Sequence, residues 1–229
     1  MAKRAAKALV PKAASVSTIQ VLAIDSNHEP ITKPVYDYRE AVVYPYMTSR
    51  GLVITKLQGS LARRHYVVEE ATKPDVQYLT GVGHGLFDTY TGDYGEILFQ
   101  IGHYDAAEVE GKIIHLISCQ AGRDLGPDFV KNGCQAFFGY DENFSYLADK
   151  QELFFECDSE IDKGFADGLT AEEVFVRVKQ RYDDKIEELE TNGSQKSLYT
   201  ASFLETNRDH LRCPSSGGKK WGDTSARLH

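Results

Sequence analysis

The sequence predicts an α/β fold built on a mostly parallel sheet. Short apolar runs rich in β-branched and aromatic residues alternate with segments of helical pattern, beginning strand, helix, strand, helix, strand. Several runs are apolar on both faces and end near glycine, as buried parallel strands do. At 229 residues the chain can form one large core, and its middle has no stretch of linker composition. We therefore expect a single α/β domain.

The first half of the chain predicts three strands and two helices. The apolar runs at 19–24, 52–57 and 76–80 are strands, and the third leads to the glycine-rich stretch 81–85. Residues 38–49 have a helical pattern that Pro45 must kink or divide. Ser60 can cap a second helix that continues to Ala71, where Lys73 and Pro74 end it.

The second half continues the alternation. Residues 86–95 form an aromatic, glycine-rich loop suited to shaping substrate access, and an apolar run at 97–101 follows. Strands are predicted at 112–118 and 135–140, with a helix between them ending near 132–133 and another at about 151–164. A capping box at 170–173 begins the best-defined helix, whose buried stripe is Val174, Val178, Tyr182, Ile186 and Leu189.

The two ends differ in composition from the body. Residues 1–17 contain four basic residues and no acid, which predicts a flexible basic tail, although an organelle transit peptide has a similar composition. Residues 208–229 include a Pro-Ser-Ser-Gly-Gly-Lys-Lys stretch, so a flexible C-terminal tail is expected there. The folded domain should therefore span residues 18–207.

Charge and cysteine content exclude several classes of protein. The formal net charge is -8, so nucleic acid is not expected as the main ligand except through the basic tails. No apolar stretch approaches the roughly 20 residues that span a bilayer. The four cysteines form no C-x-x-C pair and no dense disulfide framework. These features predict a soluble cytoplasmic protein with reduced thiols, without a signal peptide and without membrane partners.

One histidine and one cysteine follow two of the predicted strands. His84 lies in Gly81-Val82-Gly83-His84-Gly85, and Cys119 lies in Ser118-Cys119-Gln120-Ala121-Gly122. Residues just past neighbouring parallel strands meet at the carboxyl edge of the sheet. A cysteine nucleophile needs a base, and a following helix N-terminus would lower its pKa. The small residues Gly85 and Gly122 would let backbone N–H groups approach a carbonyl oxygen.

The other candidate residues have simpler interpretations. Structural roles are expected for Cys134, Cys157, Cys213 and the strand residue His115, while His103 is a loop residue that can at most touch substrate. A metal site formed by His84, His103, His115 and Cys119 lacks the local spacing of familiar ligand pairs. The sequence has no P-loop, G-x-G-x-x-G or G-x-S-x-G motif. We therefore expect no cofactor and no metal.

Together these motifs resemble the caspase-like cysteine peptidases of clan CD, particularly the CHAT and gingipain-like (peptidase C25-like) members. The resemblance covers roughly residues 18–190 and rests on the sequence motifs at 83–85, 116–122, 132–139 and 168–173. It implies a three-layer α/β/α caspase-like (caspase-hemoglobinase) fold with a mostly parallel central sheet. It also implies a His84–Cys119 dyad and an oxyanion hole formed by the N–H groups of Gly85 and Cys119.

The resemblance departs from true caspases at the nucleophile. The motif around the caspase nucleophile is Gln-Ala-Cys-Arg/Gln-Gly, whereas the sequence of this chain at 118–122 is Ser-Cys-Gln-Ala-Gly. Many other members of the clan cut after Arg or Lys and use an acidic pocket. Asp141 and Asp25, each just past a predicted strand, are the candidates for substrate-binding acids here. Both positions also suit a loop acid or a helix cap.

The expected function is that of a cysteine endopeptidase acting on a protein or peptide substrate. Members of this clan are often activated by cleavage or by a partner, and 86–95 and 141–160 are the segments expected to order on activation. A regulatory partner or a larger assembly is accordingly expected. The alternative is a noncatalytic caspase-like interaction or assembly module, and a flavodoxin-like small-molecule binder would need phosphate-cradling loops that the sequence lacks.

Overall fold

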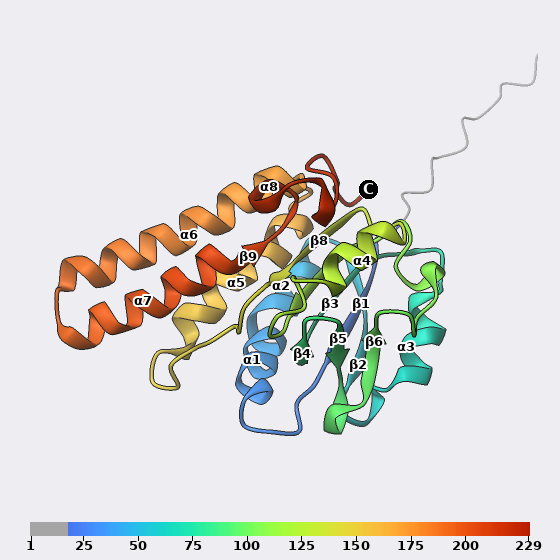
Figure 1. The fold of residues 1–229 in the computed structure, drawn as a ribbon, viewed down its shortest axis with the longest axis horizontal. Coiled ribbons are helices and arrows are strands. Elements are labelled where there is room, and N and C mark those ends of the chain that lie inside the picture. The colour runs from blue at the N-terminus through green and yellow to red at the C-terminus, as the bar shows by residue number, and fades with distance from the viewer. Residues whose placement is uncertain (1–17) are drawn as a thin grey trace, which may run out of the picture.

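The computed structural model describes residues 18–229, so the expected tail at 1–17 lies outside the described residues. Its main sheet has six strands in the order β2-β1-β3-β7-β8-β9 (Figure 1). The first five are mutually parallel, and β9 is antiparallel to β8. In chain order the strands are β1 Gln20–Asp25, β2 Val53–Gln58, β3 Val76–Val82, β7 Ile113–Ile117, β8 Ala136–Tyr140 and β9 Leu211–Arg212.

A small antiparallel sheet lies at the carboxyl edge of the main sheet. It consists of β4 His84–Leu86, β5 Thr89–Thr91 and β6 Ile97–Gln100. The stretch 86–95, expected to be a loop, therefore contributes a β-hairpin. The Tyr90 hydroxyl, buried on β5, donates to the Ile24 carbonyl of β1 at 2.8 Å, which fixes the hairpin against the main sheet.

Helices cover both faces of the main sheet. They are α1 Thr32–Tyr38, α2 Tyr44–Ser49, α3 Arg64–Ala71, α4 Leu125–Lys131, α5 Gln151–Ala166, α6 Ala171–Asn192, α7 Gln195–His210 and α8 Pro214–Gly217. Single 3-10 turns occur at Gly59–Leu61, Asp93–Gly95, Ala106–Glu108 and Lys219–Trp221. Among the described residues, no helix is both long and apolar enough to cross a bilayer.

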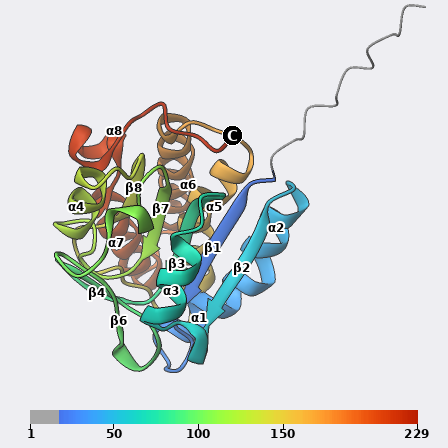
Figure 2. The ribbon, with the colours of Figure 1, turned by 90° about the vertical axis from the view of Figure 1, so that its right-hand side faces the viewer.

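The alternation of side chains along β1 divides the core into two halves. Val21 and Ala23 pack into the half that includes α1, α2, α5 and α6, whereas Leu22 and Ile24 pack into the half that includes α3, α4 and the hairpin. All four side chains are fully buried. Figure 2 shows the sheet between these two layers. The fold is therefore the expected three-layer α/β/α arrangement around a mostly parallel sheet.

The helix predicted at 38–49 begins earlier and contains an irregular turn. It starts with α1 at Thr32, passes through a π-helical segment at Arg39–Val43 and continues as α2 with Pro45 in its first turn. Proline lacks the N–H of a regular helical turn, and a wider turn before it accommodates this. The expected interruption is therefore present as a π segment, and it directs Arg39 into the core.

The prediction of a flexible tail at 208–229 is wrong for the described structure. Helix α7 continues to His210, and β9 then pairs with β8. Trp221 is buried, and its indole N–H donates to the Gly122 carbonyl at 2.7 Å, close behind the cysteine loop. The composition of this segment is that of a loop, but the burial of one large aromatic side chain anchors it.

Helices α6 and α7 form a long antiparallel hairpin that reaches beyond the sheet (Figure 1). Helix α6 begins at the predicted capping box, in which the Thr170 hydroxyl accepts from the Glu173 N–H and the Glu173 carboxylate accepts from the Thr170 N–H. Four side chains of the predicted stripe are buried, namely Val174, Val178, Tyr182 and Ile186, whereas Leu189 is only partly buried.

Candidate active site

His84 and Cys119 follow neighbouring parallel strands, as the sequence predicts. Strands β3 and β7 pair in register up to Val82 and Ile117, and the Gly83 N–H donates to the Ile117 carbonyl at 3.2 Å. His84 lies two residues beyond the end of β3, and Cys119 lies two residues beyond the end of β7. The pairing of the strands therefore brings both residues to the carboxyl edge of the sheet.

The two loops touch at Gly85. A Cβ atom added to Gly85 would lie 2.5 Å from the Cys119 carbonyl oxygen and 2.9 Å from the Ser118 hydroxyl oxygen. A Cβ atom 2.5 Å from a carbonyl oxygen would overlap with it, so only glycine allows this approach. The residue after the histidine is thus packed directly against the backbone of the cysteine.

The hairpin holds the histidine side of this contact. The Thr91 hydroxyl donates to the His84 carbonyl at 3.3 Å, and the Phe87 carbonyl accepts the Leu125 N–H at 2.8 Å. Strand β4 is therefore hydrogen-bonded to β5, and the turn that follows β4 is hydrogen-bonded to the start of α4, the helix after the cysteine. These bonds link the position of the histidine to that of the cysteine loop.

The chain turns sharply immediately after Cys119. Gln120 has a φ of 59°, in the left-handed region that non-glycine residues rarely adopt. Its N–H donates to the Glu142 carbonyl at 3.0 Å, and the Gly122 N–H donates to the Tyr140 carbonyl at 2.8 Å. Within residues 18–229 the Cys119 N–H has no backbone or side-chain acceptor. The N–H groups of Gln120 and Gly122 are therefore held by hydrogen bonds, whereas the Cys119 N–H remains available to bind an acceptor.

The environment of the Cys119 thiol differs from the expected one. Its side chain is half-buried, and this burial raises the pKa of the thiol, while the backbone N–H of Phe144 acts in the opposite direction. Helix α4 begins only at Leu125, six residues after Cys119. The N–H group that opposes the effect of burial thus comes from the 141–146 segment.

Glu29 is a site residue that the sequence analysis missed. Its carboxylate lies 3.2 Å from the Nε2 atom of His84. Partial burial opposes ionisation, but hydrogen bonds from the Thr32 hydroxyl and the N–H groups of Ile31 and Thr32, together with nearby His84, lower the pKa of Glu29. Glu29 is therefore ionised at neutral pH and partners the imidazole. A loop acid more than fifty residues before His84 gives no local sequence signal of this contact.

The prediction that Asp25 binds substrate is wrong for this structure. Asp25 is 0% exposed at the end of β1. Its carboxylate accepts from the Tyr44 hydroxyl and the Val82 N–H, and it lies 3.3 Å from the guanidinium of Arg39. Burial raises the pKa of Asp25, and Arg39 opposes that rise. Asp25 thus organises the interior beneath the strand ends and presents no oxygen to a ligand.

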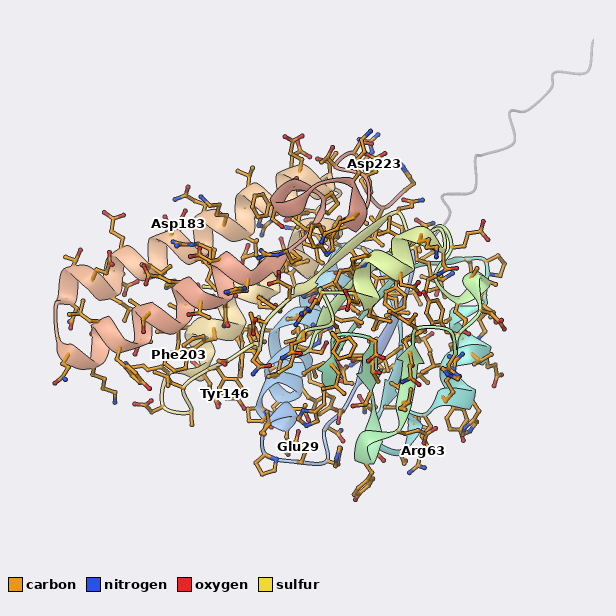
Figure 3. The ribbon with its side chains drawn as sticks, in the orientation of Figure 1. Glu29, Arg63, Tyr146, Asp183, Phe203 and Asp223 are labelled. Carbon is orange, nitrogen blue, oxygen red and sulfur yellow. The ribbon has the colours of Figure 1, made fainter. Side chains whose placement is uncertain are left out.

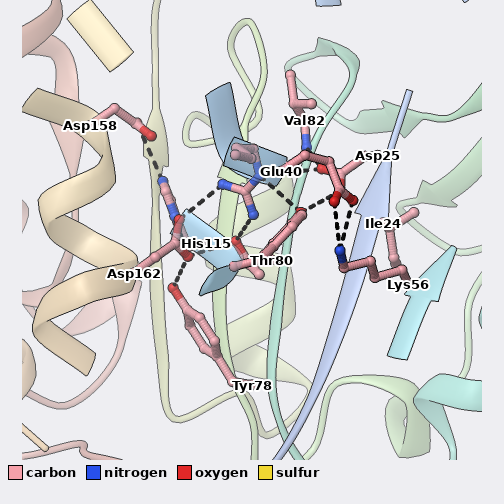
Figure 4. Close-up of polar contacts among 12 residues, drawn as sticks. Ile24, Asp25, Glu40, Lys56, Tyr78, Thr80, Val82, His115, Asp158 and Asp162 are labelled. Atoms are coloured by element: carbon pink, nitrogen blue, oxygen red, sulfur yellow. Dashed lines mark hydrogen bonds and ion pairs between the residues drawn. The ribbon is translucent and has the colours of Figure 1, made fainter. Parts of the chain in front are cut away.

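Asp25 belongs to a network of charges buried between the sheet and α5 (Figure 4). The Arg39 guanidinium also donates to Asp162 at 2.9 Å and to the Thr80 hydroxyl at 2.7 Å. Despite burial, Arg39 and His115 hold the pKa of Asp162 below its usual range. These contacts join β1, β3 and the π-helical segment to α5 beneath the site.

His115 occupies the second half of this network. It is fully buried on β7, with its Nδ1 atom 3.2 Å from Asp162 and its Nε2 atom 3.4 Å from Asp158. Burial opposes protonation, but the two carboxylates raise the pKa of His115 to about 9. His115 is therefore a charged residue of the core, four positions before the cysteine.

Asp141, the second predicted substrate-binding acid, is engaged within the protein. Its carboxylate lies 2.9 Å from the His210 Nδ1 atom and 2.5 Å from the Arg212 Nε atom. Asp141 lies beside the cysteine loop, but its carboxylate already forms an ion pair with Arg212. Binding of a basic substrate side chain by Asp141 would require breaking the ion pair with Arg212.

The remaining cysteines and His103 lie away from His84 and Cys119. Cys134, Cys157 and Cys213 are each at most 4% exposed, and burial raises the pKa of all three thiols. His103 is exposed in the turn after β6. Among the described cysteines, Cys119 alone is solvent-accessible at the carboxyl edge of the sheet.

Together, the sheet order, the layers and the hairpin define a caspase-like fold. Among solved structures, the chain is similar to the Arg-specific cysteine proteinase gingipain R, with a TM-score of 0.58 and 12% sequence identity. The match covers 92% of this chain and 47% of that chain, so this chain corresponds to about half of the gingipain R chain. No protein-family model and no curated protein sequence matches it. The similarity establishes the fold.

Proposed function

We propose that this protein is a cysteine endopeptidase with Cys119 as nucleophile and His84 as general base and acid. The observation that carries the proposal is the backbone contact at Gly85, because it brings a partly exposed cysteine and a histidine that is 43% exposed to one edge of the sheet. Peptide hydrolysis by a thiol needs these two groups together with donors for the oxyanion. Binding of a peptide is further supported by the exposed Leu86 and Phe87 immediately after His84.

The reaction proceeds in two halves. His84 takes the thiol proton as Cys119 Sγ attacks the scissile carbonyl carbon, and it then gives that proton to the departing amine as the C–N bond breaks. Water next attacks the thioester, giving one proton to His84 as the new C–O bond forms. The C–S bond breaks, the thiolate recovers its proton from His84, and the carboxylic acid product leaves.

Glu29 and two backbone groups have supporting roles in this proposal. The Glu29 carboxylate beside Nε2 orients the imidazole and stabilises its protonated form, which leaves Nδ1 to exchange the proton with the thiol. The N–H groups of Cys119 and Gly85 bind the oxyanion. Support for this comes from the Cys119 N–H, which has no acceptor within residues 18–229.

Activation by a partner or by cleavage belongs to the same proposal. Because burial raises the pKa of Cys119, the thiol is mainly protonated at neutral pH in the free chain. A partner or a cleavage that rearranges residues 86–95 or 141–160 would change the exposure of the sulfur. A basic preference at the residue before the cleaved bond has no support from Asp25 or Asp141, since Arg39 and Arg212 already occupy them.

A peptide-library assay tests the function. The wild-type chain should cleave a defined subset of a pooled library, and both Cys119→Ala and His84→Ala should abolish that cleavage. The matched controls Cys134→Ala and His103→Ala should retain it, because those residues lie elsewhere in the fold. Cleavage after Arg or Lys would establish a basic preference. Cleavage that persists in Cys119→Ala would contradict the proposal, and a folded wild type that cleaves nothing would favour the noncatalytic alternative.

A further inference from the structure

The 141–146 segment, which follows β8, lies against the cysteine loop on one side. The Gln120 N–H donates to the Glu142 carbonyl at 3.0 Å, and the Gln120 side-chain amide donates to Asn143 Oδ1 at 3.2 Å. Burial raises the pKa of the Cys119 thiol, and the backbone N–H of Phe144, in the same segment, lowers it. The thiol environment therefore depends on where this irregular segment lies.

Helix α7 holds the other side of the same segment. Asn207 Oδ1 accepts the Ser145 N–H at 3.1 Å, and Asn207 Nδ2 donates to the Ser145 carbonyl at 2.8 Å. Asn207 is only 1% exposed, so water does not compete for either bond. Both ends of one carboxamide are thus committed to the backbone of Ser145, three residues after the Glu142 carbonyl that accepts from the cysteine loop.

Further contacts anchor the ends of the segment. The Asp141 N–H donates to the His210 carbonyl at 3.1 Å, at the end of α7. The Tyr146 hydroxyl donates to the Ile31 carbonyl at 2.7 Å, in the loop that carries Glu29, and Figure 3 shows Tyr146 and Glu29 along the same edge of the molecule. Of these contacts, only the Asn207 clamp holds the backbone next to Phe144.

We propose that Asn207 is a positioning residue, which acts through Ser145 to hold the 141–146 segment against Cys119 and thereby sets the reactivity of the thiol. The proposal deepens the proposed function, on which it rests for the role of Cys119. Asn207 acts on the thiol through Ser145 and Phe144 and does not touch the substrate. An asparagine is suited to this, because its amide group matches both the donor and the acceptor of a peptide unit.

The test is the pH dependence of alkylation of Cys119 by iodoacetamide in the full chain, measured by mass spectrometry of the peptide containing Cys119. In Asn207→Leu the clamp is lost, and Phe144 no longer keeps its N–H at the sulfur. The midpoint of the profile should rise by about half a pH unit to one unit, with an alkylation rate at neutral pH roughly three- to tenfold lower. The titratable groups nearby are unchanged; they are His84, Glu29, Arg123, Asp141, Glu142, His210 and Arg212.

Asn132→Leu is the matched control. Asn132 also uses its side-chain amide at a helix end, where Nδ2 donates to the Asp128 carbonyl and to the Tyr104 hydroxyl, far from the 141–146 segment. Its alkylation midpoint should equal that of the wild type. A wild-type midpoint in folded Asn207→Leu overturns the proposal, and so does an equal shift in Asn132→Leu.

A second variant decides the matter if Asn207→Leu does not fold. Asn207→Asp keeps an acceptor for the Ser145 N–H but places a second acceptor against the Ser145 carbonyl, so the midpoint should rise here too. An unchanged midpoint in folded Asn207→Asp would overturn the proposal. Alkylation needs no turnover, so a shifted midpoint in a chain that cleaves no peptide refutes the proposed function alone. A cleaving chain with an unshifted midpoint refutes the positioning role alone.

Discussion

His84 and His115 lie in contrasting regions, His84 at the carboxyl edge of the main sheet and His115 in the core beneath it. His84 is partly exposed and faces one carboxylate, whereas His115 is fully buried between two. In the buried network, partners fix the charge state of each group and hold strands and helices together. At the exposed edge, the imidazole and the thiol remain partly accessible to solvent. The same residue type is thus buried in an ionic network on β7 and partly exposed just past the end of the neighbouring strand β3.

The largest effect should come from breaking the buried network at Arg39. Arg39→Met leaves the carboxylates of Asp25 and Asp162 without their cation in the core, and this should destabilise the fold by about 3–5 kcal/mol. The free energy of unfolding in urea measures the change. Arg50→Met is the control, because Arg50 is 49% exposed and its solvent-screened ion pair with Asp167 should contribute far less to stability. Equal losses in the two variants would contradict the distinction between the regions.

Alkaline pH should weaken the buried network before it affects the exposed edge. The folded-state pKa of His115 is raised to about 9, above the unfolded value near 6.5. The stabilisation is therefore fully present below about pH 6.5 and is lost as pH rises through about 9, amounting to at most roughly 3 kcal/mol.

Urea unfolding from pH 6 to 10 measures this loss. In His115→Gln the stability should be lower at pH 6 and should change little between pH 7 and 9, because the titrating group is gone. His84→Gln is the control and should keep the wild-type pH dependence. A wild-type slope in His115→Gln would show that other groups cause the alkaline loss.

The smallest of these effects should come from the carboxylate at the exposed edge. Glu29→Gln removes the charge beside His84. Its remaining side-chain oxygen can still accept from Thr32, and only the exposed hydrogen bond from the Ile31 N–H is lost, so kcat/KM for a cleaved peptide should fall about tenfold with little loss of stability. Glu96→Gln, which affects an acid paired with Arg63, is the control. A kcat/KM within twofold of the wild type would exclude Glu29 as the partner of His84.

The sequence predicted the elements with strong local patterns. The strands around β1, β2, β3, β7 and β8 appear within a few residues of their predicted bounds, and α6 begins at its capping box. These features follow from apolar runs and local hydrogen bonds. The adjacency of the strands that carry His84 and Cys119 was also predictable, since parallel strands bring their carboxyl ends to one edge.

Features that depend on distant contacts were not predictable. The segment 208–229 has the composition of a flexible tail, and only the burial of Trp221 behind Gly122 reveals its order. Asp25 follows a strand like a site residue, yet Arg39 reaches it from a π-helical turn and draws it into the core. Glu29 and Asn207 act across the fold on residues with which they share no motif.

The most direct test of the central claim is covalent labelling with a thiol-directed peptidyl ketone, followed by mass spectrometry to locate the modified residue. If Cys119 and His84 form the catalytic pair, a single label should appear on Cys119 in the wild type and none in Cys119→Ala, and labelling should be at least about a hundredfold slower in His84→Ala. A label that persists in Cys119→Ala, or one that forms equally fast without His84, would contradict it.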